Sequence, residues 1–468
     1  MKERESVPQI VPDKSISGST AGPTVSGKRS SSRRPSRDED AKVRSNRVSL
    51  YVLVGLLAFA PFAFGAVEYW AIAVVELLAV ILAITWVIGG VRRGEIHLGF
   101  NSMAWAAVGL QLWIILQLML GRSLDRNGTR DSLFLLFSYF LVFLVVSNER
   151  WSSRLIRNLG FWIAAIGVAT ALLGIIQFFS WNGKLYWIRA LDAGTPFGPY
   201  VNRNHFAGLM EMTIPISLGL SISQRLARVW RILLTVFSVV MALALFISVS
   251  RGGILSLTAS LFVFVYLFSR RREAKLILFT VGLSGMVVVA GLMWLGTLPR
   301  LERVLTVPQL NQEAGYRDRL RIANDTLQLI QDHPYIGTGL GTFALAIPPY
   351  LSWSQKVSWD KTHNDYLQLL SEVGLGGFAF AVCWILGLFH SVLARVRDKT
   401  ESMSPMRLGA FCGCVSLLIH SLVDFNLQIP ANALFFTVLA ALATRKNNVR
   451  RIQPSTETFP IPAEQRPI

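Results

Sequence analysis

Long apolar runs that contain no charged residue constrain the fold of this chain more than any other feature. They recur through most of its 468 residues, and 52% of all residues are hydrophobic. An apolar helix of about 20 residues spans the hydrocarbon core of a bilayer, and a soluble domain rarely repeats such runs. The runs are continuous rather than alternating in polarity, which disfavours a transmembrane β-barrel. We therefore expect an all-α polytopic membrane protein.

The apolar runs predict about 12 transmembrane helices, at approximately 48–66, 68–90, 99–120, 131–147, 156–179, 204–223, 229–249, 253–269, 275–295, 366–394, 407–424 and 430–445. Lysine and arginine gather in alternate connections, at 92–93, 150–157, 225–231, 270–275, 395–399 and 445–451. The positive-inside rule makes these connections and both termini cytoplasmic. The opposite connections at 65–70 and 424–430 contain neither lysine nor arginine.

This topology divides the chain into three regions. Residues 1–47 form a basic head rich in Ser, Pro and Arg, which we expect to be disordered and cytoplasmic. Residues 48–445 form the membrane domain, and residues 446–468 form a second cytoplasmic tail. The net charge of +18 comes from the head and from residues beside apolar runs, so it indicates contact with membrane lipids rather than nucleic acid. The three cysteines lie within apolar runs, so we expect neither a metal site nor a cofactor.

The longest segment on the non-cytoplasmic side is 296–362, which predicts one large loop. Within it, EAGYRDRLRIANDTLQLIQDHP is typical of an amphipathic helix that Pro334 ends. Its expected apolar stripe consists of Leu320, Ala323, Leu327 and Ile330. Arg317 and Arg321 lie one turn apart and face the same way. The glycine-rich IGTGLGTF that follows lacks the spacing of a dinucleotide fingerprint and predicts a packed or re-entrant turn.

Two arginines at the outer ends of predicted helices are candidates for binding an anionic substrate. Arg203 lies in YVNRNHFAGLM at the start of the sixth helix, beside Asn202. Arg251 lies at the tip of a short outer turn in SVSRGG, against the local charge bias. The N–H groups of a helix N-terminus favour anions, and a guanidinium group binds phosphate through two hydrogen bonds. The alternative is an interfacial arginine that reaches lipid headgroups.

His363 opens the tenth predicted helix in THNDYLQLLSEVGLGG. A histidine at the membrane surface can act as a general base towards a hydroxyl group, and a hydrogen-bonded structural histidine is the alternative. Asp365, Gln368 and Glu372 follow it on one polar face of the helix.

Asp424 lies in the outer turn between the last two predicted helices, within HSLVDFNLQIPANALFF. It can pair with an arginine of the site or with a helix N-terminus, and we favour a structural role. Glu211 lies about two turns below Arg203, which makes it a weaker candidate beside the site. Charged and imidazole groups are costly near lipid, so their convergence at one face indicates a site for an anionic, lipid-linked substrate.

A set of motifs is together similar to those of the O-antigen ligase/polymerase family, the Wzy C-terminal domain superfamily. They are VNRNHFAG, SRGG, the R-x-R-x-R segment before HPYIGTGLGTF, THNDYLQLLSEVGLGG and HSLVDFNLQIPANA. The resemblance covers about residues 50–445. It implies a GT-C-like glycosyltransferase of the bacterial inner membrane, with a large periplasmic loop between late helices and no metal. The basic head has no counterpart in the family pattern.

The resemblance also implies roles for single residues. Arg203 and Arg251 would hold the diphosphate of the donor, and His363 would lie beside the acceptor hydroxyl. Arg317 would be a further contact to phosphate or sugar. The other expected substrate-binding residues are Arg321, Asn202, Asn364 and Asp424.

We expect the chain to transfer a glycan from an undecaprenyl-diphosphate carrier to an acceptor hydroxyl at the periplasmic face. A ligase would use lipid A-core or a protein as acceptor, and an O-antigen or exopolysaccharide polymerase would use another lipid-linked glycan. The ligase is favoured because the histidine motif and the outer arginines resemble that branch. A twelve-helix transporter is less favoured, because the polar groups lie at one face rather than at the midplane.

Overall fold

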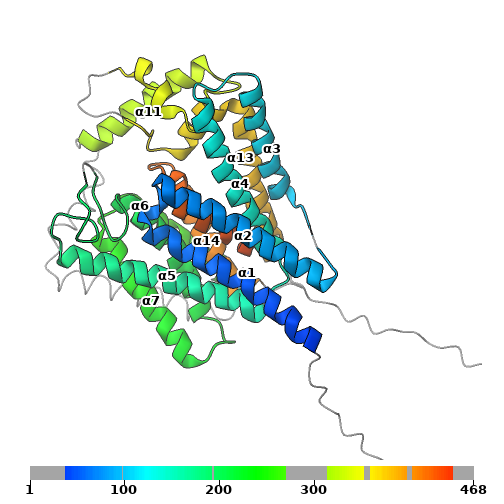
Figure 1. Ribbon diagram of the computed structural model, residues 1–468. Helices are drawn as coiled ribbons and strands as arrows, with labels where there is room; N and C mark the ends of the chain where they lie inside the picture. The colour runs from blue at the N-terminus through cyan, green and yellow to red at the C-terminus, as the bar shows by residue number, and fades with distance from the viewer. Residues whose placement is uncertain are drawn as a thin grey trace, which may run out of the picture. The chain divides into compact units, whose positions relative to one another are not determined.

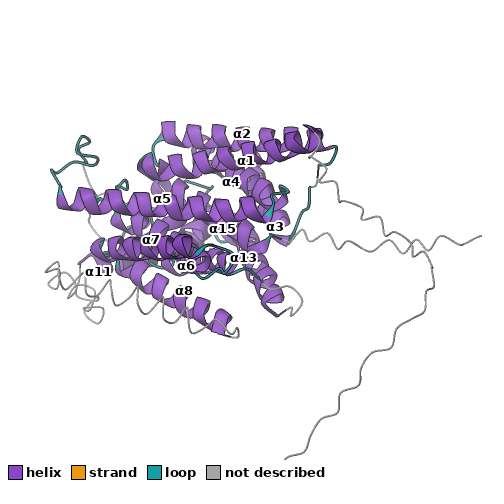
Figure 2. Ribbon diagram, turned by 90° about the horizontal axis from the view of Figure 1, so that it is seen from below, coloured by secondary structure: helices purple, strands orange, loops and turns teal. Residues whose placement is uncertain are grey.

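The computed structural model describes residues 37–96, 98–191, 194–269, 314–352, 359–397 and 403–445. In the first range side chains are described from residue 47 on, and in the fourth range from residue 317 on. The chain divides into two units, Met1–Ala41 and Lys42–Ile468, and the site described below lies in the second. Every regular element among the described residues is a helix (Figure 1, Figure 2). The all-α fold class is therefore confirmed for this part of the chain.

The predicted transmembrane helices coincide with described helices, except for 275–295, which lies outside the described residues. The first eight helices are α1 (Arg37–Phe62), α2 (Tyr69–Arg93), α3 (Ser102–Met119), α4 (Arg126–Asn148), α5 (Ser153–Phe179), α6 (Arg203–Ser221), α7 (Arg228–Ile247) and α8 (Arg251–Ser269). The later ones are α11 (Ala314–Asp332), α12 (Phe343–Ala346), α13 (Asp365–Arg397), α14 (Pro405–His420) and α15 (Pro430–Thr444). Short 3-10 turns are η1 (Phe64–Ala66), η3 (Pro348–Tyr350) and η4 (Asn426–Gln428).

Seven of the described helices are long and apolar enough to cross a membrane, namely α2, α3, α4, α5, α7, α8 and α13. The segment Arg47–Phe62 of α1, together with α14 and α15, forms shorter apolar helices. The chain is thus a multi-pass membrane protein, and the number of twelve spans and the sides of its loops remain predictions.

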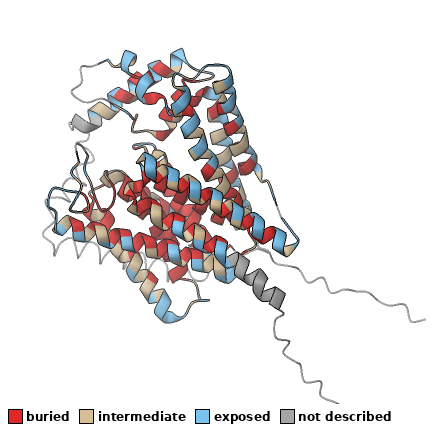
Figure 3. Ribbon diagram, in the orientation of Figure 1, coloured by how far each residue is buried: buried red, intermediate tan, exposed pale blue. Residues whose placement is uncertain are grey.

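The interior of the bundle consists of α6, α14 and α15. Every residue of α15 is buried, as is nearly every residue of α6 and α14 (Figure 3). α6 packs against α14, α7, α5 and α8, and α14 also packs against α8 and α15. The outer helices instead expose large apolar side chains, such as Leu77 at 58% and Phe262 at 72%. An apolar outer surface is suited to lipid, so the shorter inner helices are shielded from the bilayer by the longer ones.

Helix α11 and the segment after it have a small hydrophobic core of their own. It consists of Ile322, Leu329, Phe343, Ala346 and Ile347. The expected apolar stripe of this helix is wrong, because Leu320 and Leu327 are 47% and 44% exposed. Ile322 and Leu329 repeat with the same spacing but lie two residues further along, on nearly the opposite face of the helix. That face carries the burial because Phe343 and Ala346 of α12 and the following Ile347 pack against it, and α11 also contacts α13 and η3.

The glycine-rich segment 336–343 packs into a break in α13, as the sequence predicted for a packed turn. Gly374 interrupts the helix with a φ of +61°, a conformation in which a side chain would be strained. The N–H of Leu375 donates to the carbonyl of Pro334 at 2.8 Å, and the N–H of Thr338 donates to the carbonyl of Ser371 at 3.1 Å. The break frees backbone groups of α13, and the glycine-rich segment satisfies them.

Candidate functional site

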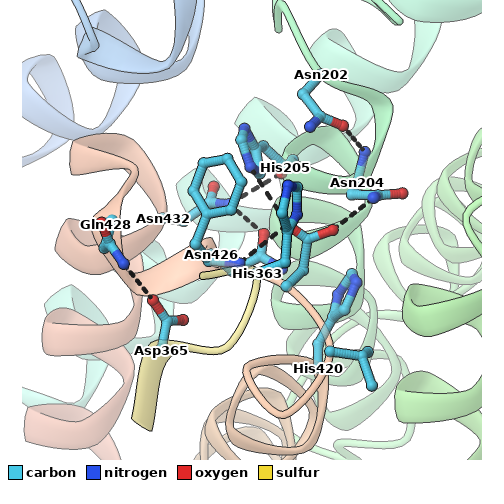
Figure 4. Close-up of polar contacts among 12 residues, drawn as sticks. Asn202, Asn204, His205, His363, Asp365, His420, Asn426, Gln428 and Asn432 are labelled. Carbon is cyan, nitrogen blue, oxygen red and sulfur yellow. Dashed lines mark hydrogen bonds and ion pairs between the residues drawn. The ribbon is translucent and has the colours of Figure 1, made fainter. Parts of the chain in front are cut away.

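Side chains from three other stretches of the chain converge on the carboxylate of Asp424, which is fully buried. Its Oδ1 atom lies 3.6 Å from Nδ1 of His363 and 3.7 Å from Nε2 of His205. Its Oδ2 atom lies 3.6 Å from Nη2 of Arg319 and accepts a hydrogen bond from Nδ2 of Asn204. Figure 4 shows His205, His363 and Asn204 gathered at this point. We call these five residues the Asp424 cluster.

Phe425 links the two histidines of the cluster. Its backbone N–H donates to Oδ1 of Asp424 at 2.9 Å. Its ring meets the rings of His205 and His363 edge to face, with centroids 4.6 and 4.9 Å apart and an interplanar angle of 71° in both cases. The two imidazoles therefore flank one carboxylate oxygen and one aromatic ring.

Asp424 lies beyond the end of α14, and its charge is compensated from several sides. Burial alone would raise the pKa of this carboxyl group, because it disfavours the charged form. The nearby imidazoles of His205 and His363 and the charge of Arg319 outweigh burial and hold the pKa of Asp424 well below its usual range. The surroundings of Asp424 thus favour its ionised form, and its arginine partner is Arg319, which was not one of the arginines expected at the site.

His363 occupies a strained position directly before α13. Its φ is +54°, which is uncommon for a residue with a side chain. The next residue, Asn364, fixes this turn: its Oδ1 accepts from the N–H groups of Tyr366 and Leu367, both at 3.0 Å, and its Nδ2 donates to the carbonyl of Leu422 at 3.0 Å. Backbone strain that the surroundings hold in place is typical of functional sites. Asn364, an expected substrate-binding residue, serves here as the cap of α13.

The N-terminus of α6 positions His205 and Asn204. Asn202 is the N-cap of this helix, and its side chain accepts from the N–H of Asn204 at 2.9 Å. Nδ2 of Asn432 donates to the carbonyl of His205 at 2.9 Å, and the hydroxyl of Tyr200 donates to Oδ1 of Asn432 at 3.1 Å. Asn202 was expected to bind substrate, and in the structure its oxygen caps the helix that presents the cluster.

The two expected phosphate-binding arginines each begin a helix. Arg203 is the first residue of α6, next to Asn204, and Arg251 is the first residue of α8. Gly252 packs so tightly against His420 that a Cβ atom there would lie 2.7 Å from Nε2 of the imidazole. The glycine thus allows the start of α8 to reach the end of α14, close to Asp424.

Glu211 pairs with His420 inside the bundle. Its Oε1 atom lies 3.2 Å from Nδ1 of His420, and both side chains are almost completely buried. This pair joins α6 to α14 below the Asp424 cluster. The sequence placed Glu211 beside the site but gave no signal for its partner.

Arg319 is the arginine of α11 that reaches the cluster. Besides its contact with Asp424, its Nη1 donates to the carbonyl of Val423 at 2.9 Å. Arg317 and Arg321 are exposed, and Arg321 lies 3.8 Å from Asp318. A step of two residues turns a helix by about 200°, so Arg319 faces away from the other two. The expected contacts in the R-x-R-x-R segment were Arg317 and Arg321, and the middle arginine, Arg319, was not among them.

The predicted polar face of α13 extends from the cluster to the glycine-rich segment. Asp365 accepts from the N–H of Leu427 at 2.9 Å, and Nε2 of Gln368 donates to Oε1 of Gln428 at 2.7 Å. Gln368 also donates to Oε1 of Glu372 at 3.1 Å. Asp365 and Gln428 are drawn together in Figure 4. These side chains fix the turn that carries Asp424.

Glu372 ends this network by holding the glycine-rich segment. Its Oε2 accepts from the N–H of Gly341 at 2.9 Å, and its Oε1 accepts from the N–H of Phe343 at 3.3 Å. Among the described residues, no group of three or more His, Cys, Asp or Glu side chains is placed to hold a metal ion.

Comparison with known families identifies part of the chain. Residues 236–382 match a family described as O-antigen ligase. This range contains Arg251, Arg319 and His363, whereas Arg203, His205 and Asp424 lie outside it. A search of curated proteins finds no match. The expected resemblance is confirmed, and it supports glycan transfer of the ligase or polymerase type.

Proposed function

We propose that this member of the O-antigen ligase/polymerase family transfers a glycan from undecaprenyl diphosphate to an acceptor hydroxyl at the periplasmic face of the bacterial inner membrane. Both termini would be cytoplasmic, which puts the Asp424 cluster on the outer side. The observation that carries the proposal is the contact between Nδ1 of His363 and the buried carboxylate of Asp424.

The Asp424 contact selects the form of His363 that a transfer reaction needs. A carboxylate at Nδ1 favours the tautomer with its N–H on that nitrogen, which leaves the lone pair of Nε2 available as a base. The side chain of His363 is 19% exposed, whereas that of Asp424 is 1% exposed. A substrate can therefore meet the histidine but not the carboxylate behind it.

The proposed reaction is a single displacement at the anomeric carbon of the donor. The acceptor oxygen forms the new glycosidic bond as the bond to the diphosphate oxygen breaks, and the diphosphate leaves with the electron pair. The hydroxyl proton passes to Nε2 of His363, and Asp424 stabilises the resulting imidazolium. Proton transfer of this kind contributes about 100-fold or more to rate.

Guanidinium groups would stabilise the charge that develops on the leaving diphosphate. We assign this role to Arg203 and Arg251, which begin α6 and α8 beside the cluster, and propose no metal for it. Arg319 is about one third exposed and uses Nη1 and Nη2 within the protein, so further N–H groups can reach a substrate. Arg317 and Arg321, exposed on the same helix, would contact the glycan or a phosphate.

Transfer can be tested with the full-length protein in lipid nanodiscs. The assay uses a polyprenyl-diphosphate-linked oligosaccharide and an acceptor with a free hydroxyl, and mass spectrometry detects the new glycosidic bond. We expect product from the wild type and none from Arg251→Ala or His363→Ala. Arg130→Ala is a matched control, because Arg130 is an exposed arginine paired with Asp131. Flux of the lipid-linked glycan across vesicles without a new bond would instead support a carrier.

We favour ligase over polymerase, with lipid A-core or a protein as the acceptor. The envelope glycans of a deletion strain separate the two activities. Long lipid-linked chains and loss of polymer from its acceptor indicate a ligase. Accumulation of single lipid-linked repeat units indicates a polymerase.

A further inference from the structure

His205 shares the Oδ1 atom of Asp424 with His363, yet the proposed transfer reaction gives it no role. Its Nε2 atom lies 3.7 Å from Oδ1, and within the described part of the chain this buried atom makes no hydrogen bond. Its side chain is 8% exposed, against 19% for His363. Burying a histidine costs free energy unless a polar partner compensates for the lost water. The buried carboxylate is the partner of His205, which suggests that this contact has a role.

The two oxygens of Asp424 have different partners. Oδ2 faces Asn204 and Arg319, while Oδ1 faces the two imidazoles and the N–H of Phe425. The position of Oδ1 determines how well His363 is oriented, and on that side His205 is the second side chain that approaches it. Without His205, only His363 and the backbone N–H of Phe425 would hold Oδ1 in place. The carboxylate could then rotate more easily towards Asn204 and Arg319.

We propose that His205 is a positioning residue for glycan transfer, which fixes the Oδ1 atom of Asp424 so that His363 is held in its reactive orientation. The inference rests on the proposed function. His205 itself is too buried to touch the donor or the acceptor. Its effect on the reaction is therefore transmitted through Asp424, and it should vanish when that carboxylate is removed.

Three substitutions at this position separate positioning from packing. In His205→Gln, the amide Nε2 can take the place of the imidazole Nε2, and we expect kcat within about twofold of the wild type. His205→Leu has no donor and His205→Asn is too short to reach Oδ1. For both we expect kcat to fall about tenfold with an unchanged KM for the donor, because the polar contact of His205 with the charged Oδ1 atom is lost. Thermal unfolding midpoints show that each variant is folded.

A double-mutant cycle tests the route of the effect. In the Asp424→Ala background, adding His205→Leu should lower kcat no further, because the shared partner is already gone. Equal fold losses in both backgrounds would overturn the inference. Equal kcat values for His205→Gln and His205→Asn would also overturn the inference. This comparison remains informative if His205→Leu does not fold. If the wild type transfers no glycan, the proposed function itself is wrong. If the wild type is active but the effects of His205→Leu and Asp424→Ala on kcat are independent, only the role of His205 is wrong.

Discussion

His363 and Asp424 lie 3.6 Å apart across two segments that are far apart in the chain, and the imidazole is partly exposed while the carboxylate is buried. The relationship resembles the pairing of a general base with a group that orients it. In the proposed mechanism the carboxylate is required for transfer, although its burial keeps it out of contact with a substrate.

Replacing Asp424 by Asn should leave the fold intact and lower kcat about 100-fold. The amide keeps the shape of the side chain and removes the charge that stabilises an imidazolium at His363. The rate of transfer in nanodiscs checks this expectation. A kcat near that of the wild type would show that the carboxylate has no part in the reaction.

The acid stability of the protein should report on the same group. The pKa of Asp424 is lowered in the folded protein, so its contribution to stability is fully present above the unfolded value of about 3.9 and is lost as the pH falls below that value. Between about pH 4 and about pH 3, the thermal unfolding midpoint should fall more steeply for the wild type than for Asp424→Asn. Parallel curves for the two proteins would contradict the lowered pKa.

Arg319→Ala and Arg317→Ala form a matched pair on α11. The first removes a contact with Asp424 and with the carbonyl of Val423, and we expect a stability loss of about 1 kcal/mol, since the side chain is partly exposed. The second removes an exposed side chain and should leave the unfolding midpoint nearly unchanged. The same midpoint for both variants would show that Arg319 does not hold α11 to the bundle.

Glu372→Ala should destabilise the connection between α13 and the glycine-rich segment. It leaves the N–H groups of Gly341 and Phe343 without their carboxylate partner, which costs about 2 kcal/mol. Asp131→Ala is the control, because Asp131 is an exposed carboxylate with one surface partner. Limited proteolysis between α11 and α13 should be faster for the first variant alone.

Gly374→Ala should lower the thermal unfolding midpoint more than an alanine elsewhere in α13. A φ of +61° is strained for alanine, and the added Cβ would meet the backbone of Tyr335. Together these effects cost about 2 kcal/mol or more. Gly387 provides the comparison, since it lies in the regular part of α13. An unfolding midpoint that is lower for Gly387→Ala than for Gly374→Ala would contradict this account.

The sequence predicted the described helices of the bundle because apolar runs and helix length follow from the thickness of a bilayer. His363, Arg203, Arg251 and Asp424 could be chosen because such groups are rarely placed near lipid without a partner or a task. The contact between Asp424 and His363 was not predictable, since it depends on how the ends of α6, α13 and α14 meet.

The orientation of α11 shows why its apolar stripe and the arginine that reaches the site were predicted wrongly. Leu320 and Leu327 repeat every seven residues, and so do Ile322 and Leu329, so the pattern fits two opposite faces. Packing against α12, η3 and α13 selects the second face, and Arg319 then reaches Asp424. Asn202 has the same difficulty, because an amide that caps a helix cannot be told from one that binds a sugar by residue type alone.

The interruption at Gly374 also has a consequence for where the reacting groups lie relative to the bilayer. Residues 375–397 rise about 34 Å as an α-helix, close to the hydrocarbon thickness of about 30 Å. The part of α13 before the glycine begins at Asp365, two residues after His363. In the proposed topology, the helix after Gly374 crosses the bilayer and its length sets the height of His363 above the opposite leaflet. A one-residue insertion after Gly374 would add about 1.5 Å to this helix and turn the residues on its two sides by about 100° relative to one another, which would work against the contact between His363 and Asp424.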